Sequence, residues 1–441
     1  MIVNTDSICI VDDTNEILDS NEALFLKTKL NSKYIDKLPS NVKIISPKDL
    51  DSYLLRSFKL IGITGTNGKT TTLSCIYFLL SNLGYKCATL GTRGFFINGV
   101  QINPRGLTTP SLLEISYNMH LASLDNCDYF IMEVSSHGIA QGRIEGLNFD
   151  IKILSNIQSD HLDFHETYEE YIKVKNSFFS DSSLKLINRD CKNAAFNIEN
   201  LYTYGIENIS NFKVDAYGIR DCIDAHITFN DFKNKTKESG MLFSNLLGKH
   251  NLYNLLASIS CVKLLNANIS LNEICLLLSK FNGVEGRMEI VHRNPMVIVD
   301  FAHTPDGMKN IFEAFRGLHP KVLFGAGGNR DRFKRKEMGA IAQRYAKKIY
   351  ITSDNPRNEN PHSIIQDILE GITNVDSVLI ESNRKIAIQK ALQELNDDEI
   401  LLILGKGDES YQIIGDQLFD FDDRLEVLRY YGINNASLSK F

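Results

Sequence analysis

The sequence predicts an α/β protein of more than one domain, on three observations. The chain has 441 residues, about three times the length of a typical single domain. A Gly-containing turn near residue 65 separates an apolar strand from a helical stretch. After residue 295, four apolar strands each run into a polar loop and alternate with helical segments. That βαβ rhythm is typical of a doubly wound parallel sheet.

Composition excludes several classes of protein. With 43% hydrophobic and 23% charged residues, the chain has enough apolar mass for packed cores and is not intrinsically disordered. The net charge is −6, from 48 basic and 54 acidic residues. A broad electrostatic surface for nucleic acid is therefore not expected, and basic residues should gather in local pockets instead.

The cysteines and the N-terminus indicate the compartment. No two of the eight cysteines are closer than twelve positions, so there is no zinc-finger spacing, and scattered single thiols fit a reducing environment. The first residues carry neither the basic nor the apolar part of a signal peptide. No stretch has the length and apolarity of a membrane span. We expect a cytoplasmic, monomeric protein.

The elements follow one another with distinct patterns. Residues 1–57 alternate short apolar runs with polar turns and show little periodicity, and a Gly-bearing connector near residue 284 is a plausible boundary. We therefore expect three domains: 1–57, 58–284 and 285–441. The central one is predicted to contain strands at 58–63, 128–134 and 151–157, meandering strands over 205–245, a helix over 251–267 and a second helical stretch that ends near Phe281.

The segment Gly65–Thr70 has the properties of a phosphate-binding loop. Its glycines let backbone N–H groups approach phosphate oxygens at a helix N-terminus. Lys69 is placed to reach the β- and γ-phosphates, and the Thr70 hydroxyl to ligate Mg²⁺. The strict pattern requires Gly where this chain has Ile63, so the loop is a variant. It predicts a nucleoside triphosphate ligand.

One acidic residue and one histidine lie at or just after the ends of predicted strands. Glu133 closes an apolar strand, and His161 lies in the segment 160–163, which follows another. Oxygen ligands with one His favour Mg²⁺ or Mn²⁺ over zinc. Each residue taken singly is also compatible with a capping or structural role.

Lys175 lies in a helical stretch beside Tyr171, and by itself it is interpreted as a solvated lysine.

The polar loops after the four C-terminal strands should lie together. In a doubly wound sheet, ligands bind outside the carboxyl ends of the strands, and all four loops would occupy that edge. They comprise residues 302–306, 326–331, 353–357 and 405–409.

Ten motifs, in order, resemble the Mur ligases of bacterial peptidoglycan synthesis. The resemblance covers nearly the whole chain and is weakest over 1–57. It implies three domains: one for the UDP end of the substrate, a central P-loop ATPase domain, and a C-terminal Rossmann-like domain for the incoming amino acid. The motifs are TGTNGKTT, EVSSHGIAQGR, SDHLDFH, the Tyr171-to-Lys175 spacing, GKHNLYNLLA, EGRME, DFAHTPD, GGNRD, DNPR and GKG-E-YQ.

The resemblance also implies an activity. The implied activity is that of an ATP-dependent amide ligase, which adds meso-diaminopimelate to UDP-N-acetylmuramoyl-L-alanyl-D-glutamate through an acyl phosphate in cell-wall precursor synthesis. ATP and Mg²⁺ are the implied cofactors. The alternatives are a lysine-adding or folylpolyglutamate-type ligase and, in a different class, a nucleotide-dependent switch protein.

The family's functional residues carry over onto matching positions. Lys69, Glu133, His161 and Lys175 are implied to be catalytic, with Lys175 carbamylated on its side-chain nitrogen. The implied metal ligands are Thr70, Glu133, His161 and the modified Lys175. The implied ATP contacts are Gly65, Thr66, Asn67, Gly68, Lys69, Thr70, Thr71, Asn254, Arg287 and Asp300. The implied UDP-muramoyl-dipeptide contacts are Ser20, Thr108, Thr109, Ser135, Gln141 and Arg143. The implied meso-diaminopimelate contacts are Arg330, Asp354, Asn355, Pro356, Arg357, Gly405 and Glu409.

Amino-acid choice is expected to reside in the loop that ends at Arg357. The family uses D-N-P-R for meso-diaminopimelate, whose second carboxylate an Arg fork can pair bidentately. Two positions depart from the family pattern. Asn21 stands where Arg is usual, and Asp408 stands where His is usual.

Overall fold

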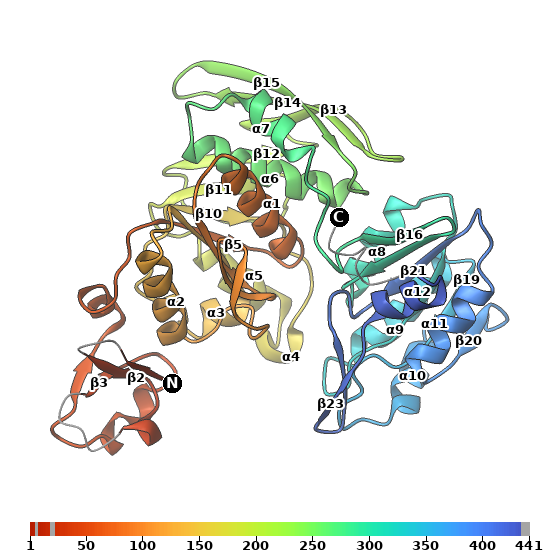
Figure 1. Cartoon of the computed structure of the whole chain (residues 1–441), viewed down its shortest axis with the longest axis horizontal. Coiled ribbons are helices and arrows are strands. Elements are labelled where there is room, and N and C mark those ends of the chain that lie inside the picture. The colour runs from red at the N-terminus through yellow and green to blue at the C-terminus, as the bar shows by residue number, and fades with distance from the viewer. Residues whose placement is uncertain (5–7, 18–22, 434–441) are drawn as a thin grey trace.

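The computed structural model describes residues 1–4, 8–17 and 23–433. Within them the chain forms three sheet-based units (Figure 1), with the N-terminal unit at lower left, the central unit above it and the C-terminal unit at right. The α/β architecture of the sequence prediction is confirmed. The exact division at 57/58 and 284/285 remains our proposal. Ser20 and Asn21 lie outside the described residues, so their predicted roles have no structural account.

The N-terminal unit is a small four-stranded sheet in the order β1-β2-β3-β4. Its strands have only three or four residues, which explains the weak sequence pattern. Its apolar side chains join one core with those of helix α2 in the central unit. The elements are β1 (Ile2–Asn4), β2 (Cys9–Val11), β3 (Ala23–Leu26) and β4 (Lys43–Ile45), with 3-10 helices η1 (Thr14–Glu16), η2 (Ser32–Lys37) and η3 (Pro47–Ser52).

The central unit is built on an eleven-stranded sheet, in the order β15-β14-β13-β12-β11-β10-β5-β9-β6-β7-β8. The strands from β13 to β6 run parallel, and antiparallel strands extend both edges. The strands are β5 (Lys59–Thr64), β6 (Cys87–Gly91), β7 (Gly94–Ile97), β8 (Val100–Asn103), β9 (Tyr129–Glu133), β10 (Ile151–Leu154), β11 (Leu184–Asn188), β12 (Leu201–Gly205), β13 (Phe212–Gly218), β14 (Ile223–Asp231) and β15 (Thr236–Ser244). The predicted meander over 205–245 is thus confirmed.

Helices cover both faces of this sheet because side chains alternate along each strand. Ile61 and Ile63 of β5 pack with α1 and α6, whereas Leu60 packs on the opposite face with α2. The helices are α1 (Lys69–Asn82), α2 (Leu112–Leu124), α3 (Ser136–Ala140), α4 (Leu162–His165), α5 (Tyr168–Ser177), α6 (Lys249–Leu265) and α7 (Leu271–Leu278).

Strand order brings distant segments to one place. β5 lies between β9 and β10, although both follow it in the chain by more than sixty residues. All three strands are parallel, so the loops at their carboxyl ends meet at one edge. Those loops begin after Thr64, Glu133 and Leu154.

The C-terminal unit is a six-stranded sheet in the order β16-β17-β21-β18-β19-β20. The four predicted strands are parallel neighbours, as expected. The sequence pattern had missed the edge strands β16 and β20 and the hairpin β22–β23, which are short and partly exposed. The strands are β16 (Glu289–Arg293), β17 (Met296–Asp300), β18 (Lys321–Phe324), β19 (Lys348–Ile351), β20 (Val378–Ile380), β21 (Ile400–Leu404), β22 (Tyr411–Ile414) and β23 (Gln417–Asp420).

Two apolar cores sandwich this sheet. One lies between the sheet and α8, α9 and α10, and the other between the sheet and α11 and α12. The helices are α8 (Pro305–Ala314), α9 (Phe333–Tyr345), α10 (Pro361–Leu369), α11 (Arg384–Gln393) and α12 (Asp423–Tyr430). No helix in the part of the chain that the structure describes is long and apolar enough to cross a membrane.

Candidate active site

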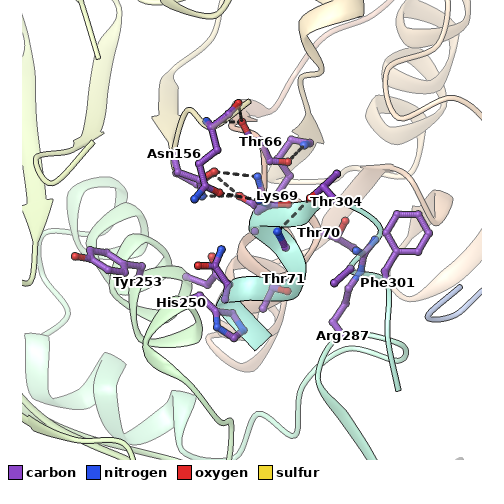
Figure 2. A pocket seen from close by; sticks show the side chains of 18 of the residues that line it. Thr66, Lys69, Thr70, Thr71, Asn156, His250, Tyr253, Arg287, Phe301 and Thr304 are labelled. Carbon is purple, nitrogen blue, oxygen red and sulfur yellow. Dashed lines mark hydrogen bonds between the residues drawn. The ribbon is translucent and has the colours of Figure 1, made fainter. Parts of the chain in front are cut away.

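A cavity of about 1090 Å³ lies between the central and C-terminal units. Figure 2 shows side chains of both units around it, with Asn156 and Thr66 on one side and Arg287 and Phe301 on the other. The loops after β5 and β10 and the last residue of β9, Glu133, line it from the central unit, and the loops after β17 and β18 line it from the C-terminal unit. A cavity at the carboxyl ends of parallel strands is a typical position for a ligand.

Lys69 folds back over the phosphate-type loop. Its ammonium donates to the carbonyl oxygens of Gly65 and Thr66, at 2.8 and 2.9 Å. A lysine ammonium has three donors, so one stays available to a phosphate in the cavity. Burial lowers the pKa of Lys69, and the nearby Glu133 carboxylate opposes that shift.

Two glycines allow the close approaches of this loop. Gly68 caps α1 in the left-handed region, with φ of 86° and ψ of −4°. A Cβ there would lie 2.2 Å from Asn254 Oδ1, and a Cβ at Gly65 would lie 1.8 Å from Ser155 Oγ. The loop therefore has space for backbone only, as a phosphate cradle requires.

We expect Gly68→Ala to weaken ATP binding at least about tenfold, because both backbone strain and the clash with Asn254 would distort the loop. Gly84→Ala is a matched control. Gly84 has a similar φ of 89°, but a Cβ there would meet nothing within 4 Å. Calorimetric titration of both variants with ATP measures the difference. Equal affinities would contradict the role of the clash.

Thr70 and Glu133 lie together beside the loop. Thr70 Oγ1 donates to Glu133 Oε1 at 2.9 Å, and the backbone N–H and hydroxyl of Thr92 donate to the same carboxylate at 3.2 and 3.1 Å. Glu133 is only 1% exposed. These hydrogen bonds hold a buried carboxylate at the rim of the cavity.

Lys175 is buried and faces the loop rather than solvent. It is 1% exposed, and its ammonium lies 3.5 Å from Thr64 Oγ1. Tyr171, one turn earlier on α5, bonds the Thr66 hydroxyl at 2.7 Å. Burial lowers the pKa of Lys175 well below its usual value, and the nearby Lys69 lowers it further. The interpretation of this residue as a solvated lysine is therefore wrong.

His161 is the N-cap residue that precedes α4, and its backbone is in the left-handed region, with φ of 55°. Its Nε2 lies 3.4 Å from Asp160 Oδ2. Desolvation within the cavity lowers the pKa of His161 to about 4, and Asp160 opposes the shift only in part. The imidazole is thus neutral near pH 7, the form that binds metals.

The donor set fits Mg²⁺ held jointly by protein and nucleotide. Among the described residues, no group of three or more His, Cys, Asp and Glu gathers to hold a metal alone. Mg²⁺ commonly takes one or two carboxylates together with substrate phosphates and waters. Thr70 and Glu133, beside the phosphate loop, supply oxygen donors of that kind.

The remaining residues expected to contact ATP also line the cavity. Asn254 comes from α6, and Asp300 ends β17. The guanidinium carbon of Arg287 lies 4.2 Å from the centre of the Phe301 ring. The Asp300 carboxylate already accepts from the backbone N–H groups of Met288 and Ala302, at 2.7 and 2.6 Å, and these two bonds orient it.

Four of the residues expected to contact the muramoyl dipeptide form one hydrogen-bonded group, namely Thr109, Ser135, Gln141 and Arg143. Thr109 Oγ1 donates to the carbonyl of Glu133 and accepts from the N–H of Ser135, at 3.0 and 2.9 Å. Arg143 donates to the Thr109 carbonyl at 2.6 Å and also bonds the Gln141 side chain. Thr108 lies at the edge of this group, where its hydroxyl is 3.1 Å from that of Thr92.

The expected amino-acid site assembles from three loops. Asn355 donates to Glu409 Oε2 at 3.0 Å, and Lys406 donates to both residues, at 3.2 and 3.1 Å. Arg357 donates to the Gly328 carbonyl at 2.9 Å. A Cβ at Gly327 would lie 3.1 Å from Arg357 Nη1 and 3.5 Å from Arg330 Cγ, so both arginines flank that glycine.

Two domain families match the chain. The Mur ligase middle domain matches residues 63–262, and the Mur ligase glutamate ligase domain matches residues 286–407. The chain belongs to the Mur ligase family. The resemblance inferred from the ordered motifs is confirmed.

Curated relatives of this Mur ligase are similar over most of its length. It is 51% identical over 419 residues to the UDP-N-acetylmuramoyl-L-alanyl-D-glutamate–2,6-diaminopimelate ligase of Helicobacter hepaticus, covering 94% of this chain and 90% of the relative. It is 54% identical over 388 residues to the ligase of the same name from Wolinella succinogenes, covering 88% of each.

Solved structures agree on the fold. A 2,6-diaminopimelate ligase of that name superposes with a TM-score of 0.65 at 26% identity, covering 96% of this Mur ligase and 94% of that chain. A Mycobacterium tuberculosis folylpolyglutamate synthase, solved with ADP and AMPPCP, superposes with a TM-score of 0.63 at 16% identity, covering 81% and 91%. The three-domain Mur ligase architecture is confirmed.

Sequence reasoning missed three residues of this site. Asn156 bonds both the N–H and the carbonyl of Asn67, each at 3.0 Å, and Lys406 links Asn355 to Glu409 in the expected amino-acid site. Asn156 and Lys406 each follow the end of an apolar strand, and this position in the sequence could have identified them as candidates. Arg105 had no comparable signal, because its partners lie in another domain.

Proposed function

We propose that this Mur ligase joins the D-glutamate carboxylate of UDP-N-acetylmuramoyl-L-alanyl-D-glutamate to an amine of meso-diaminopimelate, in the cytoplasm, where ATP is available. ATP supplies the driving force through an acyl phosphate. The name shared by relatives at 51% and 54% identity supports these substrates. The observation that carries the proposal is a cluster of charged side chains, Arg330, Arg357 and Glu409, in which Arg330 also lines the phosphate-loop cavity.

That cluster has the charges that a diamino dicarboxylic acid requires. Among the described residues, neither Arg330 nor Arg357 forms an ion pair, although the two arginines flank one glycine. Burial lowers the pKa of Arg357, and the like charge of Arg330 lowers it further. A carboxylate bound between them would relieve this repulsion. Glu409 supplies the opposite charge for an ammonium.

The nucleotide side of the proposal rests on the loop geometry. Backbone N–H groups at the start of α1 and the free donor of Lys69 would hold the phosphates of ATP. Mg²⁺, bound between Thr70, Glu133, His161 and the phosphates, would neutralise charge on the transferred group. We propose carbamylated Lys175 as a further anionic ligand.

The chain's own residues then position the reacting groups. Thr109, Ser135 and Arg143 would hold the dipeptide so that its carboxylate faces the γ-phosphorus of ATP. That carboxylate attacks phosphorus, ADP leaves, and the amine held in the pocket attacks the acyl phosphate, forming the amide and releasing phosphate. Lys69 stabilises negative charge on the transferred phosphoryl group. Enclosure between the two units would keep water from the acyl phosphate.

Phosphate release by the purified enzyme tests the proposal. With ATP, Mg²⁺ and the UDP-linked dipeptide, we expect turnover with meso-diaminopimelate and little with L-lysine. Faster turnover with L-lysine would favour the lysine-adding alternative. ATP hydrolysis that no amino acid stimulates would favour a nucleotide-dependent switch.

Substitution of Arg357 tests the assignment of the pocket. Arg357→Ala should raise the KM for meso-diaminopimelate about 100-fold, because a buried charge pair with the substrate is lost. The weak use of L-lysine should change little. Arg344→Ala, on the exposed face of α9, is the control. An unchanged KM in Arg357→Ala would remove this residue from the binding site.

A further inference from the structure

Arg105 connects the substrate loop of the central unit to the amino-acid pocket of the C-terminal unit. It lies between β8 and α2, three residues before Thr108. Its Nη2 donates to Asp408 Oδ2, and its Nη1 lies 4.0 Å from Glu409 Oε1. The paired residues are separated by 303 positions in the sequence.

The Asp408 carboxylate is buried, and the Arg105 guanidinium compensates its charge. Its side chain is 7% exposed and that of Arg105 is 20% exposed. Among the residues that the structure describes, buried Asp408 Oδ1 has no hydrogen-bond partner. Although burial opposes it, the arginines Arg105 and Arg287 hold the pKa of Asp408 below its usual value. Removal of one partner of such a pair leaves a buried charge uncompensated.

A second arginine of the central unit supports the same contact. Arg93 Nε lies 3.7 Å from Asp408 Oδ2, and Arg93 Nη2 lies 2.6 Å from Glu285 Oε2 in the connector between the units. The contact is therefore a small network. It joins the central unit, the connector and the C-terminal unit.

The loop that carries Asp408 is also packed against that connector. Gly286 has φ of 64°, and a Cβ there would lie 2.0 Å from the Asp408 nitrogen. A Cβ at Gly407 would lie 2.6 Å from the Gly286 carbonyl oxygen. One side of the loop is thus held by the connector backbone, and Arg105 holds the other.

We propose that the Arg105–Asp408 ion pair positions the loop 405–409, and with it Glu409, over the segment that holds the dipeptide. Both are positioning residues, and Asp408 has this role where the family usually carries His. The proposal rests on the proposed function. Acyl-phosphate formation involves ATP and the dipeptide alone, so loss of the pair should spare that step and impair the attack by the amino acid.

A double-mutant cycle tests the pair. Asp408→Asn and Arg105→Gln should each lower kcat/KM for meso-diaminopimelate roughly tenfold or more, mainly through KM. The double variant should be no worse than the poorer single variant, because neither charge is then left unpaired. Arg105→Lys keeps the charge and should retain more activity than Arg105→Gln. The burst of ADP formation without amino acid should stay within about twofold of wild type in all four variants.

Controls separate this proposal from the proposed function. Asp416→Asn removes an exposed carboxylate from the following hairpin and should behave as wild type. Multiplicative losses in the double variant, an equal loss of the ADP burst, or wild-type kinetics of Asp408→Asn would each overturn the proposal. If Asp408→Asn does not fold, the comparison of Arg105→Lys with Arg105→Gln decides. If wild type does not use meso-diaminopimelate, the proposed function fails, and the cycle is measured with the amino acid that it does use.

Discussion

Lys69→Ala should lower phosphate release by at least about 10³-fold, because Lys69 stabilises charge on the phosphates throughout the transfer. The same ammonium holds the loop carbonyls of Gly65 and Thr66, so ATP binding should also weaken. Initial rates with saturating substrates measure the first effect, and equilibrium titration with ATP measures the second.

A matched control distinguishes this loss from a general effect of removing a lysine. Lys86→Ala removes an exposed lysine beyond the far end of α1 and should leave the rate unchanged. Thermal unfolding should show both variants folded. If Lys69→Ala retained one tenth or more of wild-type turnover, the ammonium would have no essential part in phosphoryl transfer.

Lys175→Ala should lower activity by about 10²- to 10³-fold, and short carboxylic acids should restore part of it. The expected loss follows from removing a proposed anionic metal ligand beside the phosphate loop. Burial favours the neutral amine of Lys175, the form that reacts with carbon dioxide to give a carbamate. The carbamate at Lys175 would place an anion near the Lys69 cation, whereas the unmodified, protonated side chain would place a second ammonium there.

Lys173→Ala is the control for that experiment, because Lys173 lies on the same helix with 78% of its side chain exposed. It should have wild-type activity and no response to added acid. Carbon-13 NMR of enzyme equilibrated with labelled bicarbonate should show one carbamate signal that Lys175→Ala loses. Absence of that signal in wild type, or a lack of rescue, would argue against carbamylation.

Local patterns were sufficient for much of the fold. The phosphate-type loop, the meander after residue 205 and four strands of the C-terminal sheet all have recognisable apolar runs and turn residues. Short, half-exposed strands such as β20 (Val378–Ile380) show no such pattern. Three partly exposed residues are too few for an apolar run or an alternation of apolar and polar residues to be recognised.

Site residues that lie within a sequence motif could be predicted from the sequence. Site residues whose role depends on packing between distant segments could not. Lys69 and Thr70 belong to a turn whose chemistry is local. The neighbours of Lys175 in the sequence are typical of an ordinary surface lysine, yet the packing of α5 buries it against Thr64 at the end of β5. Burial is a property of the assembled layers, which no local window contains.

The sequence by itself determined the family, the α/β class and the identity of the chemical groups, because ordered motifs and hydrophobic periodicity are properties of the chain. The tertiary structure alone decided which groups meet. β9 and β10 flank β5 although they follow it in the chain, which brings Glu133 and Asn156 to Thr70 and Asn67. The meeting of Arg105 with Asp408 depends on the relative placement of two units, and contacts at such separations depend on topology rather than on local sequence.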